Sequence, residues 1–113
     1  MHEMSLAEGV MRIAEETALK EGAGRVTRVV LEIGRLSAVE PEALNFCLDV
    51  ASRGTRAEGA VFEMIDLPGA GWCMQCSREI ELQQVYGECP LCGSAQVQVT
   101  GGTEMRVKEL EIE

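Results

Sequence analysis

The sequence predicts an α+β fold in which two helices pack on a small three-stranded sheet that carries an inserted cysteine-rich module. Three observations support this class. Apolar residues recur at helical spacing in two segments, and β-branched residues gather in three others. Four of the five cysteines lie in residues 70–99, together with the single tryptophan and the single tyrosine. A chain of 113 residues with 46% apolar content can form one modest core plus such a module.

The first helix is expected from about Ser5 to Glu21. Ser5 and Glu8 form the S-x-x-E pattern of a capping box, and Gly22 supplies the stop. Between these ends, apolar or small residues recur at the spacing of one helical face. These positions are Leu6, Val10, Ile13, Ala14 and Thr17.

The segment RVTRVVLEIG, residues 25–34, follows as the first strand because it is rich in β-branched residues and ends at Gly34. Alternation divides its side chains between two faces. One face carries Val29, Leu31 and Ile33, and the other carries Arg28, Val30 and Glu32.

The second helix is expected over residues 41–54, because Pro41 suits a first helical turn and Gly54 ends the pattern. Its apolar stripe consists of Leu44, Cys47, Leu48 and Ala51. We therefore expect Cys47 to be a buried small hydrophobic residue rather than a metal ligand or a nucleophile.

Two further strands complete the main sheet, over residues 60–66 and 103–113. In the last strand the apolar alternation changes phase at Lys108 and Glu109, which predicts a bulge there. The expected domain division follows from this order. Residues 1–69 and 100–113 form the α+β domain, and residues 70–99 form a zinc-ribbon-like module inserted into it.

The inserted module contains Cys73-Met-Gln-Cys76 and Cys89-Pro-Leu-Cys92, separated by twelve residues. Each CxxC turn brings two sulfurs to one point, and four thiolates complete the tetrahedron that Zn²⁺ prefers. Such a closed site leaves no position for a substrate, so the zinc should be structural and should supply folding free energy to the module. The alternative is a redox motif or a pair of disulfides, but redox CxxC motifs usually occur singly beside a βαβ pattern. Trp72 is expected to pack beside these turns.

The net charge and the hydropathy of the chain exclude several classes of protein. Ten Lys and Arg against nineteen Asp and Glu give a net charge of −9, which opposes binding to nucleic acid. No apolar run approaches the ~18 residues of a membrane span. Glu3 and Glu8 stand where a signal peptide would need basic residues before an apolar stretch. The sequence therefore predicts a soluble cytoplasmic protein, in which the cysteines stay reduced and available for metal.

The only histidine in the chain is His2. At this position the α-amine of Met1, the amide nitrogen of His2 and the Nδ1 atom of its imidazole can close adjacent chelate rings. Planar nitrogen sites of this kind suit Ni²⁺ or Cu²⁺. Glu3 could add a carboxylate. The N-terminus is thus a second candidate metal site.

Taken together, MHEMSLAEGV at the start, VVLEIG followed by RLSAVEPEAL, and CxxC-x12-CPxCG resemble the HypA/HybF family of hydrogenase nickel-incorporation proteins. The resemblance implies a nickel metallochaperone, not an enzyme, that delivers Ni(II) to the [NiFe]-hydrogenase large subunit together with a HypB-type GTPase. It implies a nickel site at His2 with Glu3 and the Met1 amine, and Glu40 as a weaker candidate. It also implies zinc at Cys73, Cys76, Cys89 and Cys92, and it is compatible with a homodimer.

One departure from the family pattern limits the nickel site. Some members offer a second histidine from the zinc module, and this chain has none, so a nickel site with two imidazoles from one subunit is excluded. Three other functions remain as alternatives. They are a zinc ribbon that binds nucleic acid, a small metalloenzyme, and a structural adaptor whose N-terminus binds no metal.

Overall fold

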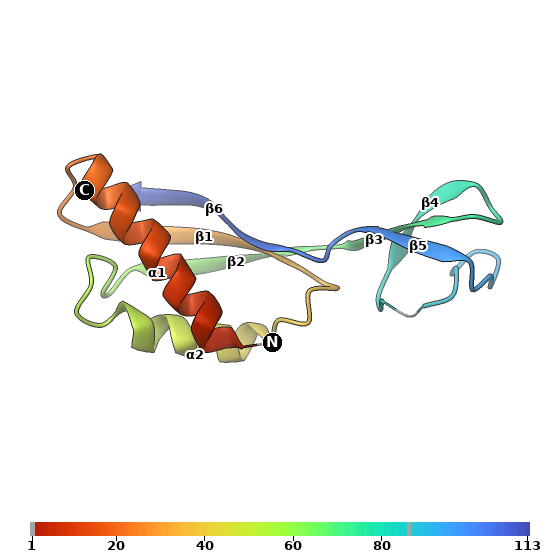
Figure 1. Ribbon diagram of the computed structural model, residues 1–113, viewed down its shortest axis with the longest axis horizontal. Helices are drawn as coiled ribbons and strands as arrows, with labels where there is room; N and C mark the ends of the chain where they lie inside the picture. The colour runs from red at the N-terminus through yellow and green to blue at the C-terminus, as the bar shows by residue number, and fades with distance from the viewer. Residues whose placement is uncertain (1, 86) are drawn as a thin grey trace. The chain divides into compact units, whose positions relative to one another are not determined.

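The computed structural model describes residues 2–85 and 87–113. The elements follow in the order α1 (Glu3–Lys20), β1 (Val26–Gly34), α2 (Pro41–Ser52), β2 (Val61–Leu67), β3 (Gly69–Cys73), β4 (Arg78–Leu82), β5 (Val97–Gly101) and β6 (Met105–Ile112). The strands form two three-stranded sheets, in the orders β2-β1-β6 and β4-β3-β5 (Figure 1). The predicted α+β class, with two helices, a three-stranded sheet and an inserted cysteine module, is confirmed.

The chain divides into two compact units. The first, here called the helical unit, comprises the residues up to Leu31 together with residues 39–65 and 106–113. The second, here called the cysteine unit, comprises residues 32–38 and 66–105. The cysteine unit therefore combines a continuous stretch with a short segment from much earlier in the chain.

Helix α1 begins earlier than predicted. His2 is its N-cap, in an extended conformation, and the carbonyl of His2 accepts the N–H of Leu6 at 3.2 Å. Ser5 therefore lies inside the first turn, so the predicted capping box at Ser5 and Glu8 is wrong. Glu3 occupies the first turn instead, where a negative charge interacts favourably with the helix dipole.

The buried face of α1 is rotated from the predicted one. Ile13 is 45% exposed, whereas the buried positions are Ala7, Val10, Met11, Ala14 and Ala18. Alanines dominate this face, and their small side chains allow α1 to pack closely against α2. The prediction of the C-terminus is confirmed to within a residue. Gly22 has φ +69°, and the N–H of Ala23 reaches the carbonyl of Ala18 at 2.8 Å, as in a Schellman motif.

β1 is the central strand of the sheet in the helical unit, and it is more buried than alternation alone predicts. Val29 and Leu31 are fully buried, and Val30 on the opposite face is also only 2% exposed. Val30 shares a strand face with Arg28. Arg28 spans this face by donating from Nε to Glu63 on β2 and from Nη1 to Glu111 on β6, each at 3.0 Å. Both faces of β1 therefore contain buried side chains.

Helix α2 begins at Pro41, with Glu40 as its N-cap, and ends at Ser52 rather than at residue 54. Leu44 and Leu48 are fully buried, but Cys47 is only half-buried, which corrects the expectation of a core position. Within the described residues, no helix is both long and apolar enough to cross a membrane.

In the cysteine unit, β3 pairs antiparallel with both β4 and β5. Cys73 at the end of β3 is buried, while the preceding Trp72 is 38% exposed. Because successive side chains of a strand point to opposite faces, Trp72 lies on the other side of β3 from Cys73. Packing of Trp72 beside the cysteine turns stays a prediction.

In the cysteine unit, three stretches of backbone pass close to one another at Gly34, Gly69 and Gly102. A Cβ atom on Gly34 would lie 2.1 Å from the carbonyl oxygen of Gly102, and one on Gly102 would lie 2.6 Å from the Cα of Gly69. The N–H of Leu36 donates to the carbonyl of Gly102 at 2.7 Å. We call this place the glycine crossing. It fastens the 32–38 segment to the chain that leaves β5.

Replacing Gly102 by alanine should destabilise the protein strongly. Gly102 has φ +83°, so alanine would add about 1–2 kcal/mol of left-handed strain and about 1–3 kcal/mol of overpacking. Gly22→Ala is the matched control, because Gly22 has φ +69° with open space around it, and should cost only the strain. Urea unfolding of both variants measures the difference. Equal losses of stability would show that the crossing tolerates a side chain.

Candidate metal centres

The two CxxC segments adopt the same backbone turn. In the first, the N–H of Ser77 donates to the carbonyl of Cys73 at 2.8 Å, and Ser77 has φ +53°. In the second, the N–H of Gly93 donates to the carbonyl of Cys89 at 2.8 Å, and Gly93 has φ +75°. The fourth residue after each leading cysteine thus takes a left-handed conformation, which turns the chain so that both sulfurs face the same side.

Backbone N–H groups point at the leading sulfur of each turn. Cys76 donates to the Sγ of Cys73 at 3.3 Å, and Leu91 donates to the Sγ of Cys89 at 3.4 Å. Burial raises the pKa of the Cys89 thiol, but the N–H groups of Cys92 and Leu91 outweigh it and bring this pKa to about 7. Hydrogen bonds of this kind favour the thiolate, which is the form that binds metal.

The opposite effect appears at Cys76, where the side-chain hydrogen bond with Cys92, together with burial, raises the pKa to about 12. Four thiolates this close repel one another. A divalent cation among them would remove the repulsion and deprotonate all four. The four cysteine sulfurs therefore favour a bound cation.

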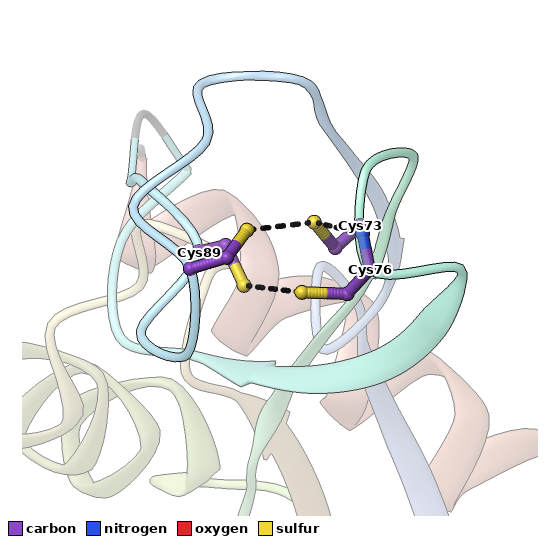
Figure 2. A group of neighbouring side chains, drawn as sticks. Cys73, Cys76 and Cys89 are labelled. Atoms are coloured by element: carbon purple, nitrogen blue, oxygen red, sulfur yellow. Dashed lines mark hydrogen bonds between the residues drawn. The ribbon is translucent and has the colours of Figure 1, made fainter.

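The sulfur positions fit a tetrahedral zinc site. All four Sγ atoms lie within 4.8 Å of one another. Between the two turns, the Sγ atoms of Cys73 and Cys92 are 3.6 Å apart, and those of Cys76 and Cys89 are 3.8 Å apart (Figure 2). Four sulfurs at about 2.3 Å from Zn²⁺ would be about 3.8 Å apart. All five cysteines are free thiols, and a separation of 3.6 Å is far beyond the roughly 2.05 Å of a disulfide.

An apolar cluster surrounds the buried sulfurs. Leu36, Ile80 and Leu82 pack with Cys73 and Cys89. Ile80 and Leu82 come from β4, whereas Leu36 comes from the 32–38 segment. None of these three apolar residues was predicted to support the metal site. The alternation of β4 could have indicated Ile80 and Leu82, but no local signal connects Leu36 with cysteines that lie far along the chain.

At the N-terminus the structure brings Glu3 and the start of α2 together. An oxygen of the Glu3 carboxylate accepts the backbone N–H of Glu40 in a long hydrogen bond of 3.4 Å. Glu40 makes no side-chain cap of its own, so Glu3 supplies the negative charge at this helix start. His2 is exposed and its imidazole makes no cap hydrogen bond. The predicted Met1 ligand lies outside the described residues.

Comparison with known proteins covers essentially the whole chain. Residues 1–112 match the family described as "Hydrogenase/urease nickel incorporation, metallochaperone, hypA". The chain is 63% identical over 113 residues to the hydrogenase maturation factor HypA of Dechloromonas aromatica, with full coverage of both. It is 57% identical to the factor of the same name from Albidiferax ferrireducens, again over the full length of both.

Solved structures give the same result. The fold is similar to the solution structure of the Ni metallochaperone HypA from Helicobacter pylori, with a TM-score of 0.70 and 30% identity, covering 99% of this chain and 97% of that one. A second solution structure, of a HypA protein, gives a TM-score of 0.73 at 30% identity, covering 100% of this chain and 97% of that one. The chain therefore belongs to the HypA family of nickel metallochaperones, which act in hydrogenase maturation.

Proposed function

We propose that this protein binds Ni(II) at its N-terminus and delivers it to the [NiFe]-hydrogenase large subunit, while zinc at the four cysteines has a structural role. The observation that carries the proposal is the match of the whole chain to a nickel-incorporation family. The protein acts as a carrier rather than as a catalyst. Nickel is its cargo.

The N-cap position of His2 supports a nickel site that includes the backbone. The first N–H groups of a helix have no intrahelical acceptor, so a metal can replace the amide proton of His2 without breaking a helical hydrogen bond. The imidazole and the Met1 amine complete the chelate. Glu3 uses one carboxylate oxygen to accept the N–H of Glu40, which leaves the other oxygen for the ion. Glu40 itself is the weaker candidate.

An exposed site suits transfer of the ion to another protein. His2 precedes the apolar face of α1 and is exposed to solvent, so a receiving ligand can approach the bound nickel. A family member of this kind works with other components of hydrogenase maturation. For this chain we propose a HypB-type GTPase and the large subunit as partners, acting in the cytoplasm, with a homodimer as one assembly.

The leading and the second cysteines of the two turns contribute differently to the proposed zinc site. When bound, Zn²⁺ supplies the positive charge that keeps four thiolates together. Cys73 and Cys89 are held by N–H donors and by the apolar cluster, and Cys76 and Cys92 close the site from the second halves of the turns. We assign this module to residues 70–99 and the nickel-binding domain to residues 1–69 and 100–113.

Metal analysis tests the proposal directly. Purified protein without a tag should contain about one zinc per chain and should take up one further nickel on titration, as measured by calorimetry and elemental analysis. Ni(II) must displace protons from the imidazole, the amide and the amine, so acidification should weaken nickel binding much more than zinc retention. Nickel bound only through the four cysteines, with loss of zinc, would contradict the assignment.

A further inference from the structure

The four cysteines of the proposed zinc site differ in their access to solvent. Cys73 is fully buried and Cys89 is 2% exposed, Cys76 is half-buried, and Cys92 is exposed. The next residue, Gly93, has open space beside it, because an added Cβ there would have no heavy atom from elsewhere in the fold within 4 Å. A small reagent arriving from solvent therefore meets Cys92 before the other three.

Cys92 lies close to a sulfur of the other CxxC turn. Its Sγ is 3.6 Å from the Sγ of buried Cys73, and the Cys76–Cys89 pair is similarly close at 3.8 Å (Figure 2). Both short separations thus join the two turns. An oxidised sulfur at Cys92 therefore has the Cys73 sulfur only 3.6 Å away, and a small movement brings the two to the roughly 2.05 Å of a disulfide.

We propose that Cys92 and Cys73 form a peroxide-sensitive pair whose oxidation releases the zinc. The Cys92 sulfur attacks the O–O bond of hydrogen peroxide, which gives a sulfenic acid and hydroxide. The Cys73 thiolate then attacks the sulfenic sulfur, which forms the disulfide and expels a second hydroxide. Two electrons pass from the two sulfurs to the peroxide, two protons from solvent convert the hydroxides to water, and Zn²⁺ leaves with its charge unchanged.

Loss of this pair removes half of the ligands. Cys76 and Cys89 alone do not complete a tetrahedral site, so the ion has no closed coordination. The apolar cluster of the unit contains few large side chains besides Leu36, Ile80 and Leu82. Oxidation would therefore loosen the whole cysteine unit and make its fold dependent on the redox state. This inference rests on the proposed zinc occupancy.

Limited oxidation and peptide mapping test the pairing in the full-length protein. The zinc-containing chain is treated with less than one equivalent of hydrogen peroxide, released zinc is followed with a chromophoric chelator, and free thiols are blocked. Arg78 is the only Lys or Arg between the two cysteine pairs, so trypsin yields residues 57–78 and 79–106 as separate peptides. A disulfide between the turns joins these peptides, whereas a disulfide within a turn does not.

We expect the joined peptides to appear in step with zinc release, and fragmentation to place the bond between Cys73 and Cys92. A bond within either CxxC turn, or between Cys76 and Cys89, would overturn the proposal. The zinc content before oxidation reports separately on the proposed function, because the connectivity of the disulfide is measured whether or not zinc fills the site.

Matched variants give a second readout. Cys92→His keeps four ligands but removes the exposed sulfur, and it should slow zinc release by peroxide on the order of tenfold or more. Cys47→Ser removes a thiol outside the four-cysteine group, so its release should remain close to that of the native protein. Zinc release from Cys92→His as fast as from Cys47→Ser would contradict the role of Cys92.

Discussion

Replacing His2 by alanine is expected to abolish tight nickel binding while zinc content and folding stay unchanged. The imidazole is exposed and makes no cap hydrogen bond, so its loss should cost no more than about 0.5 kcal/mol of stability. Loss of a direct ligand should exceed the roughly 10–100-fold affinity loss that follows removal of an outer-shell partner. Nickel calorimetry, elemental analysis for zinc and far-UV circular dichroism of the same sample measure the three quantities.

A Gly-Ser extension before Met1 separates the chelate from an ordinary histidine site. It converts the terminal amine to an amide and removes one chelate ring, while His2, Glu3 and Glu40 keep their side chains. We expect strongly weakened nickel binding. Glu40→Gln is the matched control, since it removes a carboxylate but keeps the backbone N–H that donates to Glu3. If the extended chain binds nickel as tightly as the native one and Glu40→Gln does not, a site made of side chains should replace the proposed chelate.

The second large effect concerns zinc removal. Cys76→Ser, or treatment with a strong chelator, should unfold the cysteine unit while α1 and α2 remain largely helical. Zinc binding to small zinc-finger peptides is worth about 10–16 kcal/mol, and the small apolar cluster of this unit could not replace it. The helical unit has its own core, which includes Val10, Leu44 and Leu48.

Two signals distinguish the units in that experiment. Helical circular dichroism reports on α1 and α2, and amide hydrogen exchange in β3, β4 and β5 reports on the cysteine unit. Cys47→Ser is the control, because Cys47 lies on α2 and outside the four-cysteine group. If the helical signal and the hydrogen-exchange protection of β3 are both lost, the two units unfold as one.

The order of the main helices and strands could be predicted from the sequence because periodicity and end signals are local. Gly22 ends α1 through its own positive φ, and Pro41 begins α2 through its fixed φ. Ile13 was misplaced because burial depends on what covers a face. Ala7 and Ala18 carried little weight as apolar signals in α1, and the Arg28 layer over β1 involves residues from two other strands.

The site was predicted unevenly for a similar reason. CxxC spacing is a local pattern, so the four cysteines could be grouped from the sequence, and the structure brings their sulfurs together. The approach of Glu3 to the N–H of Glu40 joins the starts of two helices, and only the tertiary fold determines it. Leu36 is comparable, since it reaches the cysteine cluster from a segment that precedes α2. Whether His2, Glu3 and Glu40 bind nickel stays a prediction.

The glycine crossing has a consequence for making chimaeras between members of this family. Gly34, Gly69 and Gly102 belong to three separate stretches of chain. A side chain on Gly34 would meet Gly102, and one on Gly102 would meet Gly69. A chimaera that exchanges the cysteine unit would therefore have to take all three glycines and Leu36 from the same parent. Exchanging only residues 66–105 would place the Gly34 of one parent against the Gly102 of the other. Crossover points within β1, β2 and β6 would keep the three glycines together.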